Sequence, residues 1–389
     1  MRIAQIAPLT EAVPPKLYGG TERVISWLTE GLVDLGHHVT LFASGDSVTS
    51  ANLEAVWPRA LRLDCNVADA NALHMMMLER VAQRASEFDF LHFHLDYYPF
   101  SLFSRLPVPF VTTLHGRLDL PEHHPTFETF SSVPVISVSD AQRLPLQQAN
   151  WVGTVHHGMP RDLLVPQIKS QTYLAFLGRI SPEKGLESAI HIACECAIPL
   201  KIAAKVDKAD ADYFAQKICP QLTHKDVDYL GEIKDEDKSD FLSGALGLLV
   251  PIDWPEPFGL VLIEAMACGT PVIAFNRGSV SEIVTNGLTG FIVESEPEAV
   301  AAVGKLSSLS RAAIRQQFEE RFTADRMASD YTRLYRNLID PRSRPAFRNA
   351  AARDPINCPV NGFPASVQRE AGRRTKVPVR PKHVMRLPK

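Results

Sequence analysis

Two glutamates, Glu256 and Glu264, are the residues of this sequence best suited to bind a polar ligand. They enclose a Pro/Gly turn that follows an apolar strand predicted at residues 246–250 and opens an almost wholly apolar helix ending at Gly269. A helix that begins there directs backbone N–H groups and the positive end of its dipole at one place, which favours phosphate. An unpaired Glu264 carboxylate within that helix would cost on the order of several kcal/mol, so it needs a partner such as a sugar diol. The spacing therefore predicts a nucleotide-sugar site.

A second loop carries two cations, Arg179 and Lys184, directly after the strand predicted at 173–178. A nucleoside diphosphate gathers negative charge as its glycosidic bond breaks, and an arginine fork with a lysine point charge would stabilise it. Together with Gly178, this loop is therefore a predicted phosphate site. The alternative is a surface ion pair with Glu183, worth ~0–1 kcal/mol.

The turn between the first strand and the first helix contains two adjacent glycines, Gly19 and Gly20, after Tyr18. Glycine lets a backbone approach a ligand closely, and the helix that follows adds free N–H groups. Thr21 is the predicted N-cap of that helix. A glycine turn before a helix is common, so this feature is weak evidence by itself.

Several side chains follow predicted strands of the first half. His115 lies at the carboxyl end of the strand at 110–115, facing the expected ligand site. His92 and His94 alternate on one strand, where packing and hydrogen bonding are favoured over metal binding. Asp140 follows the strand at 133–138 and is either a helix N-cap or, as the family resemblance described below implies, a contact for the acceptor substrate, and the residue type fits both.

The elements that must position these residues alternate between short apolar strands and helices. This order is typical of parallel sheets covered on both faces, and ligands bind at the carboxyl ends of their strands. Two such halves predict an α/β protein whose two Rossmann-like sheets face an interdomain cleft. The predicted strands are 2–7, 39–43, 90–94, 110–115, 133–138, 151–155, 173–178, 200–204, 227–230, 247–251, 271–275 and 290–293.

Four regions follow from this pattern. The predicted domains are residues 1–165 and 166–323, joined by a Pro-containing hinge, and an amphipathic helix covers 324–340. That helix either crosses back to the first domain or simply completes the second. Residues 341–389 hold twelve Lys/Arg against two acidic residues and are rich in proline, which predicts a basic disordered tail. The tail is either a solvated extension or a peripheral contact for an anionic membrane or nucleic acid.

The run EPFGLVLIE at 256–264, with residues 265–274 after it, resembles the retaining glycosyltransferases of family 4. The resemblance extends over residues 2–339 and implies the GT-B fold, with a terminal helix that packs on the first domain. It implies transfer of a sugar from a nucleoside-diphosphate sugar, a UDP-sugar or GDP-sugar, to an acceptor hydroxyl. The product would keep the donor's anomeric configuration.

The resemblance also implies roles for individual residues. Glu256 would bind the donor-sugar hydroxyls, Glu264 the ribose diol, and His115 the donor sugar. Arg179 and Lys184 would stabilise the departing phosphate, which accepts the acceptor's proton during front-face attack, so no metal or other cofactor is expected. Backbone contacts are implied for the diphosphate or acceptor at Gly19 and Gly20, for the base at Gly231 and Ile233, and for sugar and phosphate at Phe258, Gly259, Leu260 and Val261.

Other features of the sequence limit which cellular locations and which alternative functions we expect. No signal peptide or membrane-length apolar segment is expected, and six cysteines without metal-ligand spacing favour a reducing cytoplasm. The body of the chain is acidic, which argues against nucleic acid as substrate and favours a soluble acceptor of unknown identity. A Rossmann dehydrogenase would need Gly-x-Gly-x-x-Gly after the first strand. A catalytically silent nucleotide-sugar-binding protein and a GT-B epimerase or phosphorylase remain alternatives.

Overall fold

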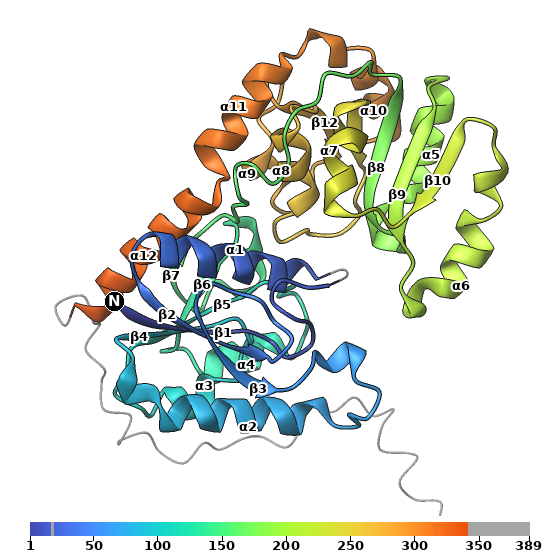
Figure 1. Cartoon of the computed structure of the whole chain (residues 1–389). Helices are drawn as coiled ribbons and strands as arrows, with labels where there is room; N and C mark the ends of the chain where they lie inside the picture. Colours follow the sequence, from blue (N-terminus) through green and yellow to red (C-terminus); the bar gives the residue numbers. More distant parts are fainter. Residues whose placement is uncertain (17–18, 341–389) are drawn as a thin grey trace, which may run out of the picture. The chain divides into compact units, whose positions relative to one another are not determined.

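The computed structural model describes residues 1–16 and 19–340, in which two parallel sheets are each covered by helices (Figure 1). The first has the order β3-β2-β1-β4-β5-β6-β7, and every pairing in it is parallel. Its strands are β1 (Arg2–Ile6), β2 (His38–Ser44), β3 (Asn52–Trp57), β4 (Phe90–Phe93), β5 (Phe110–Thr113), β6 (Pro134–Ser137) and β7 (Asn150–Thr154). The predicted tail at 341–389 and the predicted loop residue Tyr18 lie outside the described residues.

The second sheet is also parallel throughout, with the order β10-β9-β8-β11-β12-β13. These two sheets confirm the predicted α/β fold of two Rossmann-like units. Sequence reasoning missed β3, because this edge strand pairs only with β2 and mixes polar and apolar residues with little burial. The strands are β8 (Tyr173–Arg179), β9 (Leu200–Lys205), β10 (Val227–Gly231), β11 (Ala245–Val250), β12 (Val272–Phe275) and β13 (Gly290–Val293).

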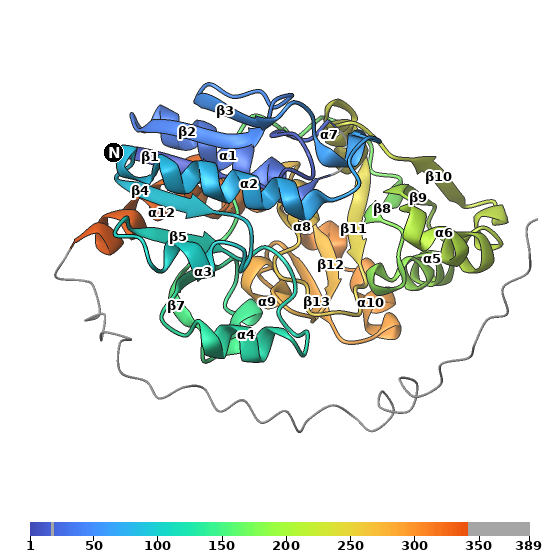
Figure 2. The ribbon, with the colours of Figure 1, turned by 90° about the horizontal axis from the view of Figure 1, so that it is seen from below.

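Helices cover both faces of each sheet. Helices α1 and α2 lie on opposite faces of the first (Figures 1 and 2), while α5 and α10 pack on one face of the second and α7 and α8 on the other. The helices are α1 (Gly20–Asp34), α2 (Ala70–Gln83), α3 (Phe100–Phe103), α4 (His123–Thr129), α5 (Leu186–Glu195), α6 (Ala211–Tyr213), α7 (Asp235–Ser243), α8 (Leu260–Ala267), α9 (Val280–Ile283), α10 (Glu296–Val303), α11 (Arg311–Arg321) and α12 (Ala324–Ile339). The predicted N-cap Thr21 is wrong: Gly19 occupies that position in extended backbone, so α1 begins earlier.

The last described helix, α12, lies beside α1 and against the first sheet (Figure 1). Tyr335 stacks on Phe90 with ring centroids 4.6 Å apart, and its hydroxyl accepts from the Gln5 amide at 3.2 Å and contacts His92 Nδ1 at 2.7 Å. The preceding helix, α11, packs on α8 of the second sheet. Helices α11 and α12, which are separated by Phe322 and Thr323, therefore lead the chain from the second sheet back to the first.

Replacing Tyr335 by phenylalanine should lower the free energy of unfolding by about 1–3 kcal/mol, because the buried amide and imidazole lose their shared partner. Tyr331→Phe is the matched control, since within the described part of the chain the Tyr331 hydroxyl has a single hydrogen-bond partner, Thr113 Oγ1, at 3.0 Å. Urea unfolding of both variants measures the difference. Equal losses of stability in the two variants would show that the hydrogen bonds of Tyr335 with Gln5 and His92 stabilise the fold no more than the single contact of Tyr331 does.

Candidate functional site

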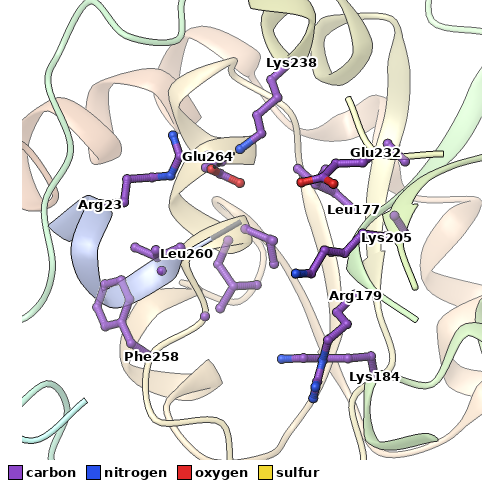
Figure 3. Close-up of a pocket in the computed structure, with 18 of the residues that line it drawn as sticks. Arg23, Leu177, Arg179, Lys184, Lys205, Glu232, Lys238, Phe258, Leu260 and Glu264 are labelled. Atoms are coloured by element: carbon purple, nitrogen blue, oxygen red, sulfur yellow. Dashed lines mark hydrogen bonds and ion pairs between the residues drawn. The ribbon is translucent and has the colours of Figure 1, made fainter. Parts of the chain in front are cut away.

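A cleft of about 1060 Å³ is lined by residues of both sheets' loops. From the first half come Gly19, Gly20 and His115, at the start of α1 and after β5. From the second half come the loop after β8 and the turn before α8 (Figure 3). The sequence-predicted residues that line this one cavity are Gly19, Gly20, His115, Gly178, Arg179, Lys184, Ile233, Glu256, Phe258, Gly259, Leu260, Val261 and Glu264.

The turn before α8 brings the predicted sugar carboxylate and one predicted phosphate cation together. Glu256 Oε2 accepts a hydrogen bond from Trp254 Nε1 at 3.0 Å and forms an ion pair with Lys184 Nζ. The Lys184 ammonium also lies 5.0 Å from the centre of the Trp254 ring, in cation–π contact. Gly259 adopts φ 82° to turn the chain into α8, where a side chain would be strained. The helix start and these charges therefore face the same space.

A neighbouring loop holds this turn in place. Ser279 N donates to the Glu256 carbonyl at 3.0 Å, and Ser279 Oγ donates to the Phe258 carbonyl at 2.8 Å. Gly278 adopts φ 55°, and a Cβ there would lie 2.3 Å from the Glu256 carbonyl oxygen. The loop at residues 277–279 therefore supports the turn before α8.

The other predicted cation, Arg179, lies among carboxylates on the cleft wall. Its guanidinium is 2.5 Å from Glu183 Oε1, 3.6 Å from Asp207 Oδ2 and 3.5 Å from Asp210 Oδ2. The ion pair between Arg179 and Glu183, which was the alternative interpretation of this loop, is present. Arg179 nevertheless also lines the cleft. An anionic ligand at Arg179 would therefore compete with these carboxylates.

Glu264 already has a protein partner. Its side chain is 8% exposed, and Oε1 accepts from Lys238 Nζ at 2.7 Å (Figure 3). Sequence reasoning expected a ligand diol to satisfy this carboxylate and missed Lys238, which lies on α7. No short-range pattern links α7 to α8, because only the packing of both helices on one face of the second sheet joins them.

His115 is one member of a buried histidine cluster. His115 Nε2 lies 2.8 Å from His94 Nδ1, and His94 Nε2 lies 2.8 Å from Gln5 Oε1. Burial lowers the pKa of His115 to about 4, so the ring is neutral at physiological pH. His157, which sequence reasoning missed, stacks on His115 at 5.3 Å and also lines the cleft. His92 and His94 take part in hydrogen bonds, the role that was favoured for them.

The buried histidines make folding stability depend on pH. Burial lowers the folded-state pKa of each below the ordinary 6.5, with His115 at about 4. The unfolded chain therefore takes up protons first, and the free energy of unfolding should decrease as pH falls from about 6.5 towards 4. Urea unfolding between pH 5 and 7.5 measures this slope. His94→Asn should reduce the slope, exposed His38→Asn should not, and a flat profile would contradict the prediction.

Two predicted residues are not in the cleft wall. Gly231 adopts φ 74° at the end of β10 and turns the chain so that its neighbours Glu232 and Ile233 line the cavity instead. Asp140, left open between a substrate contact and an N-cap, does not line the cleft. It occupies the N-cap position of the 3₁₀ turn Ala141–Leu146, but its side chain makes no capping hydrogen bond. Its Oδ1 accepts from Thr154 Oγ1 at 2.5 Å.

Further cleft residues were missed because they are isolated charges or aromatics in the sequence. They come from α1, β9, the loop after β7, α7 and the loop after β11, and are Arg23, Lys205, His157, Lys238 and Trp254. Within residues 1–16 and 19–340, no group of three or more His, Cys, Asp or Glu side chains is arranged to hold a metal ion. None of the helices in that part of the chain combines the length and apolar character needed to cross a membrane.

Comparisons with known proteins match both halves. The family described as glycosyl transferases group 1 matches residues 165–322, and glycosyltransferase family 4 matches residues 18–163. The phosphatidyl-myo-inositol mannosyltransferase of Mycobacterium leprae is 24% identical, over 88% of this chain and 99% of its own length. The N-acetyl-alpha-D-glucosaminyl L-malate synthase of Bacillus anthracis is also 24% identical, over 82% of this chain and 94% of its own.

A solved structure supports the fold. Anabaena HepE in complex with UDP-glucose superposes with a TM-score of 0.65 at 18% identity, covering 86% of this chain and 98% of that one. The nucleotide sugar UDP-glucose is the ligand in that structure. The two family matches together span most of the described chain, and the paired parallel sheets agree with them. The chain is therefore a glycosyltransferase of GT-B fold that belongs to the group 1 enzymes, glycosyltransferase family 4.

Proposed function

We propose that this protein transfers a sugar from a nucleoside-diphosphate sugar to an acceptor hydroxyl, with retention of anomeric configuration and without a metal ion. The observation that carries the proposal is the convergence at one cleft of the start of α8, the Glu256 and Glu264 carboxylates, and the cations Arg179 and Lys184. The complex of Anabaena HepE with UDP-glucose favours a UDP-sugar as donor, and a GDP-sugar is the second candidate.

In this proposal each group of the cleft has one task. The start of α8 and the two cations hold the diphosphate, where negative charge grows as the glycosidic bond breaks. Glu256 binds donor-sugar hydroxyls, Glu264 the ribose diol, and the neutral His115 ring the donor sugar. The departing phosphate oxygen takes the proton of the attacking acceptor hydroxyl on the same face. Backbone groups at Gly19, Gly20, Phe258, Gly259, Leu260 and Val261 complete the donor site, with Ile233 at the base.

The acceptor is proposed to be a hydroxyl-bearing glycan, glycolipid or small metabolite in the cytoplasm. Residues 1–170 hold twelve Lys/Arg against seventeen Asp/Glu, which disfavours an anionic membrane surface as the docking site of the first half. A peripheral membrane contact would then depend on the basic tail.

A thermal-shift screen with UDP, GDP, ADP and dTDP, each with and without Mg²⁺, tests the donor site. A nucleotide at 100 times its Kd adds about 2.7 kcal/mol of stability, which is readily measured. We expect one nucleotide to stabilise the wild type equally with and without Mg²⁺. Glu264→Ala should lose this shift, whereas Glu195→Ala, which changes an exposed glutamate of α5, should keep it.

Turnover of the matching nucleotide sugar with candidate acceptors then separates an enzyme from a silent binding protein. Release of nucleoside diphosphate that requires an acceptor supports the proposal, and the anomeric proton coupling of the product reports retention. A protein that is stabilised by the nucleotide but never releases it from the sugar would instead be a silent binder.

A further inference from the structure

Four charged side chains of alternating sign form a chain along one wall of the cleft. Glu264 Oε1 lies 2.7 Å from Lys238 Nζ, which also lies 3.0 Å from Asp235 Oδ1. Asp235 in turn forms an ion pair with Arg23 of α1. Figure 3 shows Lys238 pointing directly at the Glu264 carboxylate, with Arg23 on the other side of it. The Lys238 and Glu264 side chains are only 13% and 8% exposed.

The position of Lys238 is tightly determined. Asp235 and Lys238 are three residues apart on α7, so both side chains lie on the same face of that helix. Burial acts to lower the pKa of Lys238, but the Glu264 and Asp235 carboxylates outweigh it and raise that pKa. Lys238 therefore remains a cation at any physiological pH. Such a buried partner is costly to remove, because the other charge is left unpaired in apolar surroundings.

The contact leaves half of the Glu264 carboxylate for a ligand. Within residues 1–16 and 19–340, Lys238 is the one hydrogen-bond donor to this carboxylate, and it binds Oε1. Glu264 lines the cavity, so a ligand in the cleft meets a carboxylate that is already anchored at one oxygen. A carboxylate accepts up to about four hydrogen bonds, so a diol can bind without displacing the ammonium.

We propose that Lys238 is a positioning residue for nucleotide recognition, which anchors Glu264 so that the enzyme binds ribonucleotides in preference to 2′-deoxyribonucleotides. The proposal rests on the proposed function, in which Glu264 receives the ribose diol. Without the ammonium, the unpaired carboxylate in this apolar helix face would turn towards water and lose its defined orientation towards the 2′-hydroxyl.

Titration calorimetry of the full chain tests this with UDP against 2′-deoxy-UDP, and with the matching GDP and ADP pairs. The wild type should bind one ribonucleotide at least about tenfold more tightly than its deoxy form, the contribution typical of a hydrogen bond to a charged group. Lys238→Met, which keeps length but removes charge, should weaken ribonucleotide binding and leave deoxynucleotide binding nearly unchanged. The ratio of affinities would then approach one.

Two further variants separate this role from simple destabilisation. Lys238→Arg retains a cation that can reach Glu264, so it should restore most of the preference for ribose. Lys305→Met, an exposed lysine outside the cleft, should behave as the wild type. Thermal unfolding of all variants without ligand shows which of them remain folded. If Lys238→Met does not fold, the affinities of a folded Lys238→Arg for ribo- and deoxynucleotides are compared with those of the wild type instead.

The outcomes distinguish failure of this inference from failure of the proposed function. Equal affinity losses for ribo- and deoxynucleotides in Lys238→Met would overturn the positioning role, since the lysine would then act on the phosphates or the fold. A wild type that binds nucleotides without preference for ribose would overturn it as well. A wild type that binds none of the nucleotides would overturn the proposed function itself, together with the inference built on it.

Discussion

Lys184→Ala should lower kcat about 10²–10³-fold, the usual effect of removing one group that stabilises developing oxyanion charge. The Lys184 side chain is only 21% exposed and lies in the cleft between Glu256 and the Trp254 ring. In the proposed reaction, the charge of Lys184 stabilises the diphosphate most when the glycosidic bond is nearly broken and the diphosphate carries its greatest negative charge. Nucleotide-sugar binding, by contrast, draws on several other contacts and should weaken less than turnover.

Steady-state kinetics with the donor identified in the thermal-shift screen measures this effect. Lys169→Ala is the matched control, because Lys169 pairs with Asp240 on the surface and does not line the cleft. Lys184→Arg should recover part of the lost rate, since a guanidinium can supply the same charge. Near-normal turnover of Lys184→Ala would remove the phosphate role and leave Lys184 as a structural partner of Glu256.

Gly278→Ala should damage the donor site without touching any ligand. The new Cβ would lie 2.3 Å from the Glu256 carbonyl oxygen and 2.5 Å from its backbone nitrogen, so the turn before α8 must move. A displacement of about 1 Å at such a site can cost about 10²-fold in rate, and we expect a loss of that size in kcat/KM. Overpacking should also lower the free energy of unfolding by about 1–3 kcal/mol.

Gly287→Ala is the control that separates the effect of the steric clash at Gly278 from the effect of backbone strain. Gly287 has a similar positive φ, 77°, but a Cβ there meets nothing within 4 Å. The Gly287→Ala variant should lose only about 1–2 kcal/mol of unfolding free energy, the strain of an alanine in the left-handed region, and its kcat/KM should not change. If both variants lose stability equally and keep full activity, the Gly278 loop does not position Glu256.

Much of the architecture could be predicted from the sequence because it depends on local patterns. Short apolar strands that alternate with helices are sufficient to indicate two parallel sheets, and all the strands so predicted are present. The cleft residues that were predicted lie in strand–loop–helix turns, where glycine, proline and helix starts mark the carboxyl ends of strands. Glu256 and Glu264 belong to one such turn, so their spacing alone brings both to the same cavity.

The partners of these residues depend on contacts that no local pattern records. Lys238 reaches Glu264 from another helix, and His157 stacks on His115 from another strand's end. An isolated lysine or histidine has the same sequence signal on a surface as in a cleft, so only packing distinguishes the two. The sequence by itself therefore determined the fold class, the family and the turns that line the cleft. The tertiary structure alone decided which charges neutralise one another there, because electrostatic pairing follows distance in space and not along the chain.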